Sequence, residues 1–528
     1  MYQDVELGIY IFLAVCCLLD LLVVFKRDLM MLQQNSYRNK RYVKWFNTSN
    51  ESTNFWRLGA CIALFLLLVH HIPHIVAAIL SALILLCNFV VYVRRKYKKP
   101  LVFTARAKRI YITMLILGLA LPVTLGICLK SIYLANELGI LAIVVSPFFI
   151  LLANILLIPV EKTNNNRYVK DARKILQSNK NLKIIGITGS YGKTSTKHFL
   201  HHILEQHYST QMTPGSYNTL LGVVRTIREM LKPYTQIFIV EMGAKQTGDI
   251  KEICDLVNPE IGIVTSIGEQ HLETFKTVEN ILKTKFELVR ALPSSGLAVV
   301  NNSNPIVDKE KIDNVEVIYY GTKTSDSWKI ENLQYTNEGS TFDLTDGKDF
   351  SLRLKTPLIG EANITNLLGA VIVAKYLGVT DSEIKYAAAT MPQVEHRLQV
   401  IHAKGGYTII DDAFNSNPVG ASMAADVLSS IQTPGKRIVI TPGMIELGEI
   451  QYDKNRDFGK KIGNSADLVI VVGQYNRDAL LEGLSESSID RNKVFATSTF
   501  NEAQKLMLEH VGKGDIVLYE NDLPDTFK

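Results

Sequence analysis

The segment Ile184–Lys197, with the sequence IIGITGSYGKTSTK, limits the possible folds of this chain more than any other stretch. The apolar run Leu182–Ile187 predicts a buried strand, and Thr196–Gln206 has the pattern of a helix. The residues between them include Gly189, Ser190, Tyr191, Gly192, Lys193, Thr194 and Ser195. A glycine-rich turn between a strand and a helix points backbone N–H groups at a polyphosphate, and the helix N-terminus adds positive charge. The segment therefore predicts a nucleotide site in an α/β domain.

Two side chains in this turn suit the chemistry of a nucleoside triphosphate. Lys193 would reach the β- and γ-phosphates, and the hydroxyl of Thr194 would bind Mg²⁺. The spacing departs by one residue from the strict phosphate-loop pattern, because Ile187 stands where a first glycine is expected. The alternative is a glycine-rich turn with a solvated lysine, which explains a Lys-Thr pair at a helix start less well.

Apolar segments in the first 160 residues predict a membrane region over residues 1–162. They are Gly8–Phe25, Leu58–Val93, Ile110–Leu129 and Leu138–Val160. Leu58–Val93 is too long for one span, and His70, His71, Pro73 and His74 in its middle predict a polar turn between two helices. Each helix then has about the length needed to cross a ~30 Å hydrocarbon core. We therefore expect five spans and a multi-pass protein of the cell membrane.

The basic residues predict the orientation of these spans. They gather in three segments, which contain Lys26, Arg27, Arg38, Lys40, Arg41 and Lys44, then Arg94–Arg109, then Lys162, Arg167 and Lys170. Because cytoplasmic loops are rich in Lys and Arg, these three segments are expected in the cytoplasm and the N-terminus outside. Five spans then place the glycine-rich turn in the cytoplasm, where ATP is.

The rest of the chain predicts two further domains, over residues 163–393 and 394–528. A polar linker, Glu161–Asn181, is expected to be helical over Tyr168–Gln177. Apolar runs then alternate with helical patterns, which is typical of doubly wound parallel sheets. Val315–Lys355 instead predicts an antiparallel insert. The predicted fold is a helical membrane region followed by two α/β domains, a P-loop-type central ATPase domain and a Rossmann-like C-terminal domain.

Composition excludes some other classes of protein. The net charge of +6 over 528 residues is modest and does not indicate a nucleic-acid partner. Five of the six cysteines lie in or next to apolar segments, and no Cys-x-x-Cys pair or Cys/His cluster occurs. The sequence therefore predicts neither a zinc site nor a disulfide framework.

Three polar residues follow predicted strands or open a helical pattern. Glu241 ends the apolar run Ile237–Val240, and a carboxylate at the edge of a parallel sheet suits a Mg²⁺ ligand. His271 lies in the loop after Ile261–Thr265, and Lys285 stands in the stretch KTKFEL. Taken singly, His271 is better explained as a hydrogen-bonded loop histidine, and Lys285 as a surface lysine.

Taken in order, the motifs are more specific. TGSYGKTS, VEMGA, the His271 loop, KTKFEL, GEANITN, EHRLQV, DDAFNSNP and GMIELGE resemble the Mur ligase family from about Leu182 to the C-terminus. Within the family they look most like members that add D-alanyl-D-alanine to a cell-wall peptide precursor. The resemblance implies a reaction in which ATP phosphorylates a substrate carboxylate and an amine attacks the acyl phosphate. Metal ions and cationic groups would stabilise the charge that develops.

The resemblance also implies roles for individual residues. Lys193 and the amides of Ser190–Lys193 would hold phosphates, Thr194 and Glu241 would bind one Mg²⁺, and His271 would help bind a second. Lys285 falls where the family carries a carbamylated lysine that acts as a metal partner. Asn363 and Asn366 would contact adenine, Arg397 would contact phosphate, and Asp412 would accept hydrogen bonds from the ribose. Asn415 would help to shape the substrate site. Helix-surface amides and turn-forming residues are the alternatives for these positions.

Two departures from the family leave the substrates open. Family members usually begin with a soluble domain that binds a uridine nucleotide, and here the membrane region stands in its place. The carboxylate substrate could be UDP-linked, lipid-linked, another peptide or a polymer, and membrane lipid is an expected partner. The C-terminal stretch Leu518–Lys528 is acidic where a basic one is expected, so the amine is open too. The alternatives are a membrane-associated poly-amino-acid synthetase and a non-catalytic, nucleotide-sensing membrane protein.

Overall fold

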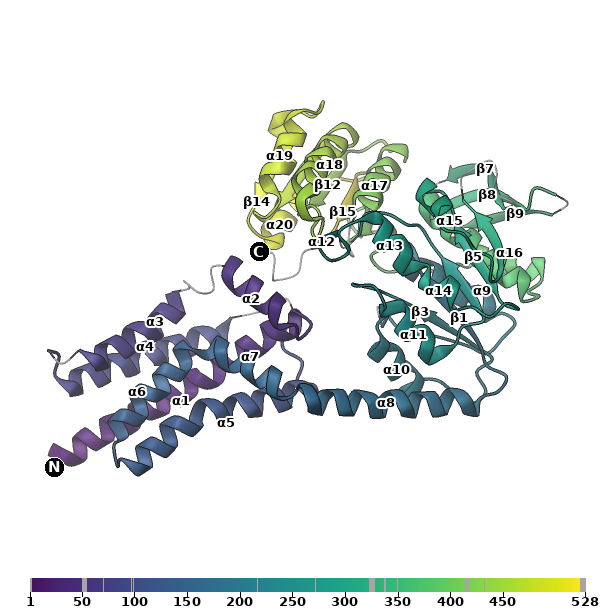
Figure 1. Cartoon of the computed structure of the whole chain (residues 1–528). Helices are drawn as coiled ribbons and strands as arrows, with labels where there is room; N and C mark the ends of the chain where they lie inside the picture. Colours follow the sequence, from purple (N-terminus) through teal and green to yellow (C-terminus); the bar gives the residue numbers. More distant parts are fainter. Residues whose placement is uncertain are drawn as a thin grey trace. The chain divides into compact units, whose positions relative to one another are not determined.

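The computed structural model of this chain describes residues 2–49, 55–69, 71–95, 97, 99–215, 217–270, 272–321, 328–336, 339–348, 350–413, 417–431 and 433–522. These residues form two units, Met1–Asn165 and Asn166–Asp522. The first is helical, and the second contains the β-sheets (Figure 1).

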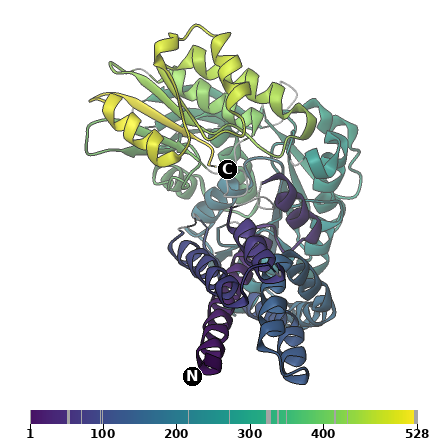
Figure 2. The same ribbon diagram turned by 90° about the vertical axis from the view of Figure 1, so that its left-hand side faces the viewer.

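The helical unit packs long apolar helices side by side (Figure 2). Its helices are α1 (Tyr2–Gln34), α2 (Asn39–Thr48), α3 (Phe55–Leu68), α4 (His74–Arg94), α5 (Ala105–Cys128), α6 (Ile132–Val144) and α7 (Ser146–Leu156), followed by the start of α8 (Ile158–Ser178). Small and aliphatic side chains such as Ala60, Ala78 and Leu85 are fully buried between them. Large apolar side chains cover the outside, for example Phe65, Leu83, Ile116 and Phe148. This distribution is that of a bundle with an apolar exterior.

Polar contacts inside this unit join one helix to another. Asn88 on α4 donates to both carboxylate oxygens of Asp20 on α1, at 2.8 and 2.9 Å. The hydroxyl of Ser81 donates to the carbonyl of Ala63 at 3.0 Å, which links α4 to α3. Interhelical hydrogen bonds of this kind help to hold membrane helices together, where apolar surfaces gain nothing by leaving lipid.

Fewer helices are long and apolar enough to cross a membrane than the five spans predicted from the sequence. Among the described residues, α1, α4 and α5 are long and apolar enough, and α6 with α7 brings the number to four if the bent pair counts as one span. The apolar part of α3, Arg57–Leu68, is shorter than a full span. The predicted division of Leu58–Val93 into two helices is confirmed, with His70 outside the described residues.

The predicted span Leu138–Val160 is not one continuous helix. Helix α6 ends at Val144, and α7 begins at Ser146 with its axis turned by 75°. Pro147 lies in the first turn of α7, where its missing N–H costs nothing, whereas inside a continuous helix it would clash with the preceding turn. The predicted linker helix over Tyr168–Gln177 is part of the longer α8.

The second unit is built on a six-stranded sheet in the order β2-β3-β1-β4-β5-β6, in which all pairs are parallel. Its strands are β1 (Lys183–Thr188), β2 (Thr210–Met212), β3 (Ile237–Glu241), β4 (Ile261–Val264), β5 (Leu297–Asn301) and β6 (Glu316–Tyr320). Strand β6 is parallel to β5, so the start of the predicted antiparallel insert Val315–Lys355 belongs to the main sheet instead. The insert itself is the antiparallel sheet β7 (Lys329–Thr336), β8 (Gly339–Thr345) and β9 (Ser351–Thr356).

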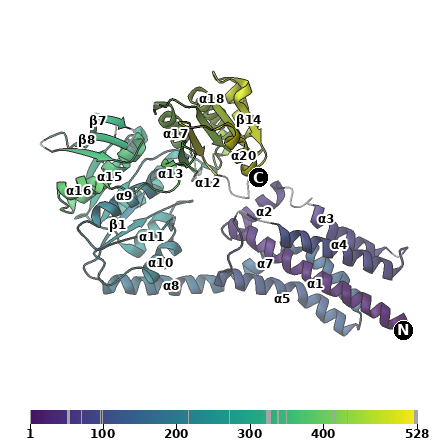
Figure 3. The same cartoon turned by 180° about the vertical axis from the view of Figure 1, so that it is seen from behind.

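Helices cover both faces of this sheet, which explains why its strands are apolar at nearly every position. Ile185 and Ile187 of β1 face a core shared with α9 (Lys193–Leu204), α15 (Glu361–Tyr376) and α16 (Asp381–Ala389). Ile184 faces the opposite core, formed with α8, α10, α11, α13 and α14. The bounds of these helices are Leu220–Glu229 for α10, Asp249–Val257 for α11, Val278–Lys285 for α13 and Glu287–Arg290 for α14. The short helix α12 (Leu272–Phe275) precedes α13. Figure 3 shows α9, α15 and α16 together with β7 and β8.

A second six-stranded sheet has the order β10-β11-β15-β12-β13-β14 and is parallel except for β10. Its strands are β10 (Gln399–His402), β11 (Thr408–Asp412), β12 (Arg437–Thr441), β13 (Leu468–Val472), β14 (Val494–Thr497) and β15 (Ile516–Glu520). Helices α17 (Pro418–Ser430), α18 (Gln451–Ser465) and α19 (Arg477–Ser485) share one core, and α20 (Phe500–His510) covers the other face. The two predicted α/β sheets are therefore confirmed.

Candidate active site

The glycine-rich turn lies at the carboxyl end of β1, in the middle of the first sheet. Gly189 and Gly192 have φ angles of +148° and +81°, which favour glycine, and α9 begins at Lys193. A Cβ atom on Gly192 would lie 2.2 Å from the side-chain oxygen of Asn366. The turn therefore needs glycine for two reasons, its backbone conformation and the close approach of α15.

The first half of the turn is fixed by the loop that follows β4. The amides of Ser190 and Tyr191 donate to the carbonyl of Ser266 at 2.8 and 3.2 Å. The hydroxyl of Ser190 donates to the carbonyl of Gly268 at 3.0 Å. Of the four amides that the resemblance assigns to phosphate, two are thus engaged by backbone, while those of Gly192 and Lys193 make no hydrogen bond within the described part of the chain. The amides of the turn that remain available to a ligand in this conformation are therefore those at the start of α9.

Lys193 folds back over the turn. Its Nζ donates to the carbonyls of Gly189 and Ser190, at 2.6 and 2.9 Å. Burial lowers the pKa of Lys193 to about 8, although the Glu241 carboxylate acts in the opposite direction, and Arg397 lowers it further. The Lys193 ammonium is therefore poorly solvated at the edge of the sheet, and a negatively charged ligand would stabilise it.

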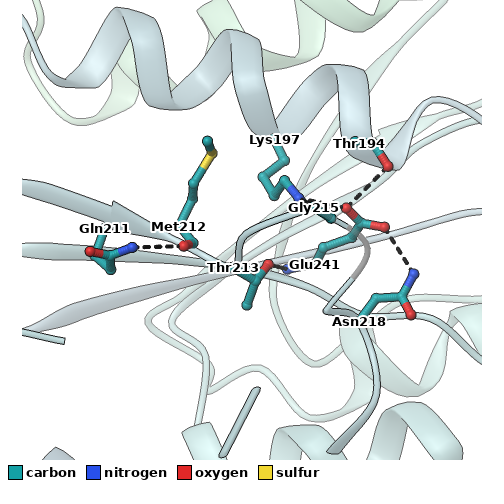
Figure 4. A network of polar contacts seen from close by, with 8 residues as sticks. All are labelled: Thr194, Lys197, Gln211, Met212, Thr213, Gly215, Asn218 and Glu241. Carbon is teal, nitrogen blue, oxygen red and sulfur yellow. Dashed lines mark hydrogen bonds and ion pairs between the residues drawn. The ribbon is translucent and has the colours of Figure 1, made fainter. Parts of the chain in front are cut away.

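Glu241 ends β3, the strand beside β1, and is 1% exposed. Its Oε2 accepts from the hydroxyl of Thr194 at 3.1 Å, and its Oε1 accepts from the amide of Asn218 at 3.0 Å (Figure 4). Burial by itself would raise the pKa of this carboxyl, but Lys197, Lys193 and the hydrogen bonds from Asn218 and Lys197 outweigh it and lower the pKa. Glu241 is therefore ionised and directed at the start of α9.

The sequence reasoning missed Lys197, which contacts the same carboxylate. Its Nζ lies 2.9 Å from Oε2 of Glu241. Its spacing was a usable signal, since a residue four positions after Lys193 lies on the same face of α9.

Lys285 is the last residue of α13, whose start is capped by the side chain of Thr277. The Lys285 side chain is 2% exposed, and the described residues make no hydrogen bond or ion pair with it. Burial, followed by the charge of Lys193, lowers the pKa of Lys285 well below its usual value. This lysine is thus a candidate neutral amine. His271, predicted to act beside it, lies outside the described residues.

Asn363 and Asn366 lie one turn apart on α15 and are both buried. The amide of Asn363 donates to the carbonyl of Ile359 at 3.0 Å, one turn back along the chain. Asn366 lies against Gly192, as described above. Of these two predicted adenine contacts, the structure therefore brings Asn366 to the glycine-rich turn.

Arg397 lies just before β10 of the second α/β sheet, and Asp412 is the last residue of β11. His396 and Leu398, on either side of Arg397, have φ angles of +58° and +50°, and the amide of Leu398 donates to Asp412 at 3.1 Å. Burial raises the pKa of Asp412 to about 6, against the opposing effect of Arg397. Burial lowers the pKa of Arg397, while Asp412 and Glu241 act in the opposite direction. Asn415, in the loop after Asp412, lies outside the described residues.

The oxygen groups near the turn suit a hard divalent cation. In the part of the chain that the structure describes, no group of three His, Cys, Asp or Glu residues converges. Mg²⁺ does not need one, because it is usually held by one or two carboxylates or hydroxyls together with waters and phosphate oxygens. The hydroxyl of Thr194 and the carboxylate of Glu241 fit that pattern.

Comparison with family models finds two matches in the α/β part of the chain. Residues 187–374 match the Mur ligase middle domain, and residues 396–519 match the Mur ligase, glutamate ligase domain. The first match covers the glycine-rich turn, Glu241 and Lys285, and the second covers Arg397 and Asp412.

Individual relatives point to the same group. The UDP-N-acetylmuramoyl-tripeptide–D-alanyl-D-alanine ligase of Bacillus subtilis (strain 168) is 26% identical over 341 residues, which are 64% of this chain and 72% of that protein. The ligase of the same name from Mycobacterium bovis is 30% identical over 358 residues, covering 64% of this chain and 70% of the relative. The crystal structure of MurF ligase from Thermotoga maritima in complex with ADP superposes with a TM-score of 0.60 at 26% identity, covering 68% of this chain and 80% of that one.

Proposed function

Because the chain belongs to the Mur ligase family, and is thus an ATP-dependent, amide-forming ligase that uses Mg²⁺, we propose that it joins D-alanyl-D-alanine or a similar amine to a cell-wall peptide precursor. The names of its relatives support this substrate class. The observation that carries the proposal is the 3.1 Å contact between Thr194 and Glu241, beside Lys193, at the carboxyl edge of a parallel sheet.

The residues around the turn divide the work of phosphoryl transfer. Lys193 and the first amides of α9 bind and orient the phosphates of ATP, and Thr194 with Glu241 would hold Mg²⁺. When bound, Mg²⁺ supplies positive charge that offsets the negative charge on the transferred phosphoryl group. Exclusion of water by the buried walls around Glu241 strengthens each of these interactions.

The remaining predicted residues complete the proposed site. Asn363 and Asn366 contact adenine, Arg397 contacts phosphate and Asp412 contacts ribose. His271 and Lys285 act at a second metal position, Lys285 after carbamylation, and Asn415 shapes the acceptor site. The burial and lowered pKa of Lys285 support its part, because only a neutral amine reacts with carbon dioxide. The domain boundaries that accompany this proposal are 162/163 and 393/394.

We also propose that the helical unit is a multi-pass membrane region with the α/β domains in the cytoplasm. The apolar exterior of its helices and the basic residues after α1, α4 and α7 support this placement. An external N-terminus requires an odd number of spans, so α3 must cross the membrane in addition to α1, α4, α5 and the α6–α7 pair. The orientation is tested with a variant that lacks all native cysteines and carries one new cysteine near the N-terminus. When intact cells are treated with a thiol reagent that does not cross the membrane, we expect this cysteine to be labelled.

The reaction is tested by incubating the purified full-length protein with ATP, Mg²⁺ and paired carboxylates and amines, and identifying the amide by mass. UDP-linked and lipid-linked peptides are compared as carboxylates, and D-alanyl-D-alanine is compared with single amino acids as amines. An amide that contains D-alanyl-D-alanine is expected. Polymers of one amino acid would indicate a poly-amino-acid synthetase, and nucleotide binding with no amide would indicate a sensor.

A further inference from the structure

Lys197 on α9 is a charged residue with no solvent contact. Its side chain is 0% exposed, and it lies one helical turn after Lys193. Lysine is almost never fully buried unless it is paired. Its Nζ donates to Oε2 of Glu241 at 2.9 Å and to the backbone carbonyl of Gly215 at 2.6 Å (Figure 4).

The first contact helps to fix the direction of the proposed metal-binding carboxylate. The Oε2 atom that accepts from Lys197 also accepts from Thr194, at 3.1 Å. The other oxygen, Oε1, is held by Asn218 at 3.0 Å. Both oxygens of Glu241 therefore have defined partners, and the carboxylate cannot rotate without breaking one of these bonds.

The second contact fixes the loop between β2 and α10, which carries Asn218. The amide of Glu241 donates to the hydroxyl of Thr213 at 3.1 Å, and the amide of Gly243 donates to the carbonyl of Asn218 at 2.7 Å. The two ends of the loop are thus tied to the end of β3. Gly215, between them, is tied to Lys197.

A purely stabilising role explains this arrangement poorly. A buried ion pair gives little net stability compared with apolar side chains of similar volume. The neighbouring residues Phe199, Leu200 and Ile203 already bury α9 in an apolar core. A lysine that reaches past this core to a carboxylate and a loop carbonyl needs another explanation.

We propose that Lys197 is a positioning residue of the ligase reaction: its ammonium directs the Glu241 carboxylate toward Thr194 and, through Gly215, holds Thr213 and Asn218 against the end of β3. The proposal rests on the proposed function in one respect, the role of Glu241 in holding Mg²⁺. Replacement of a residue that orients a metal-binding carboxylate typically costs about 10- to 100-fold in metal affinity or activity.

The test compares Lys197→Met, which keeps length and loses the charge, with Lys197→Arg, which keeps the charge and the donors. For Lys197→Met in the full-length protein, we expect kcat to fall about 10- to 100-fold and the Mg²⁺ concentration for half-maximal rate to rise by a similar factor. Lys197→Arg should recover part of both losses. The matched control is Lys461→Met, which removes a 2.5 Å contact between Lys461 and Asp426 on α17 and should change neither quantity.

A second measurement does not depend on turnover. In protein without nucleotide or metal, hydrogen exchange at the amides of Glu241 and Gly243 should be faster in Lys197→Met than in the original chain, because both amides donate to the loop that Lys197 holds. Exchange at these amides should be unchanged in Lys461→Met. If Lys197→Met does not fold, Lys197→Gln, which loses the charge but keeps N–H donors, takes its place in both measurements.

The outcomes separate this proposal from the proposed function. Unchanged Mg²⁺ dependence and unchanged exchange in Lys197→Met, with an inactive Glu241→Gln variant, would overturn the role of Lys197 alone. Normal Mg²⁺ dependence in Glu241→Gln would overturn the metal role of Glu241 and, with it, this inference. A loss of kcat that is equal in Lys197→Met and Lys197→Arg, with normal Mg²⁺ dependence in both, would also overturn it.

Discussion

The helical unit and the α/β unit both bury charged side chains, but they arrange them differently. In the helical unit, Asp28 on α1 and Arg57 on α3 lie 2.6 Å apart, and Tyr42 donates to the same carboxylate oxygen at 3.0 Å. In this pair one cation lies against one carboxylate. Around Glu241, the three lysines 193, 197 and 285 lie near one carboxylate, and two of the three have lowered pKa values.

The two arrangements of charge indicate different roles, helix packing in the helical unit and catalysis in the α/β unit. A matched pair between two helices balances opposite charges and joins the helices. An excess of buried positive charge is costly and needs a compensating anion, and such unfavourable clusters are typical of functional sites. The α/β unit therefore holds the chemistry, and its excess of positive charge suits a triphosphate. Three predictions test this distinction.

The largest effect is expected from Lys193→Ala and Glu241→Ala. Either change removes a group that binds phosphate or metal, so carboxylate-dependent ADP release should fall by at least about 10²- to 10³-fold. The variants should insert into membranes like the original chain, which gives the control. Amide formation at the original rate in either variant would remove that residue from the site.

A smaller and partly reversible loss is expected from Lys285→Ala. If a carbamylated Lys285 acts as a carboxylate-like metal partner, ADP release should fall about 10- to 100-fold. Short-chain carboxylic acids added to the assay should restore part of it by occupying the space left by the side chain. The control is Lys283→Ala, which changes an exposed lysine two residues earlier on α13 and should leave ADP release unchanged. Full activity in Lys285→Ala would place this lysine outside the chemistry.

The smallest effect on catalysis is expected from the pair in the helical unit. Arg57→Met leaves the buried Asp28 carboxylate without its cation, so the free energy of unfolding should fall by about 3–5 kcal/mol. ADP release per folded molecule should be unchanged. The double variant Asp28→Asn with Arg57→Met should regain most of the stability, as measured by thermal unfolding in detergent. A loss of kcat in the folded single variant would contradict the assignment of this pair to packing.

Local features of the fold were predictable because they depend on residues close in sequence. The glycines of Gly189–Gly192, the Lys-Thr pair after them and the alternation of apolar strands with helices each report local conformation. They predicted the glycine-rich turn between β1 and α9, the two α/β sheets and the division of Leu58–Val93 into two helices. The bend between α6 and α7 also had a local cause in Pro147, but the apolar composition of Leu138–Val160 concealed it.

Most of the candidate site depended on the order of the strands. Thr194 and Glu241 are 47 residues apart and meet because β3 pairs with β1, which no local pattern specifies. The engagement of two turn amides by Ser266 and the approach of Asn366 to Gly192 arise in the same way.

By itself, the sequence determined which segments are apolar, which turn between a strand and a helix is rich in glycine and which family motifs are present, because these follow from residue type and spacing. Only the tertiary structure decided that Lys197 shares the carboxylate of Glu241 with Thr194. Such convergence results from long-range strand pairing and loop hydrogen bonds, whose partners are far apart along the chain.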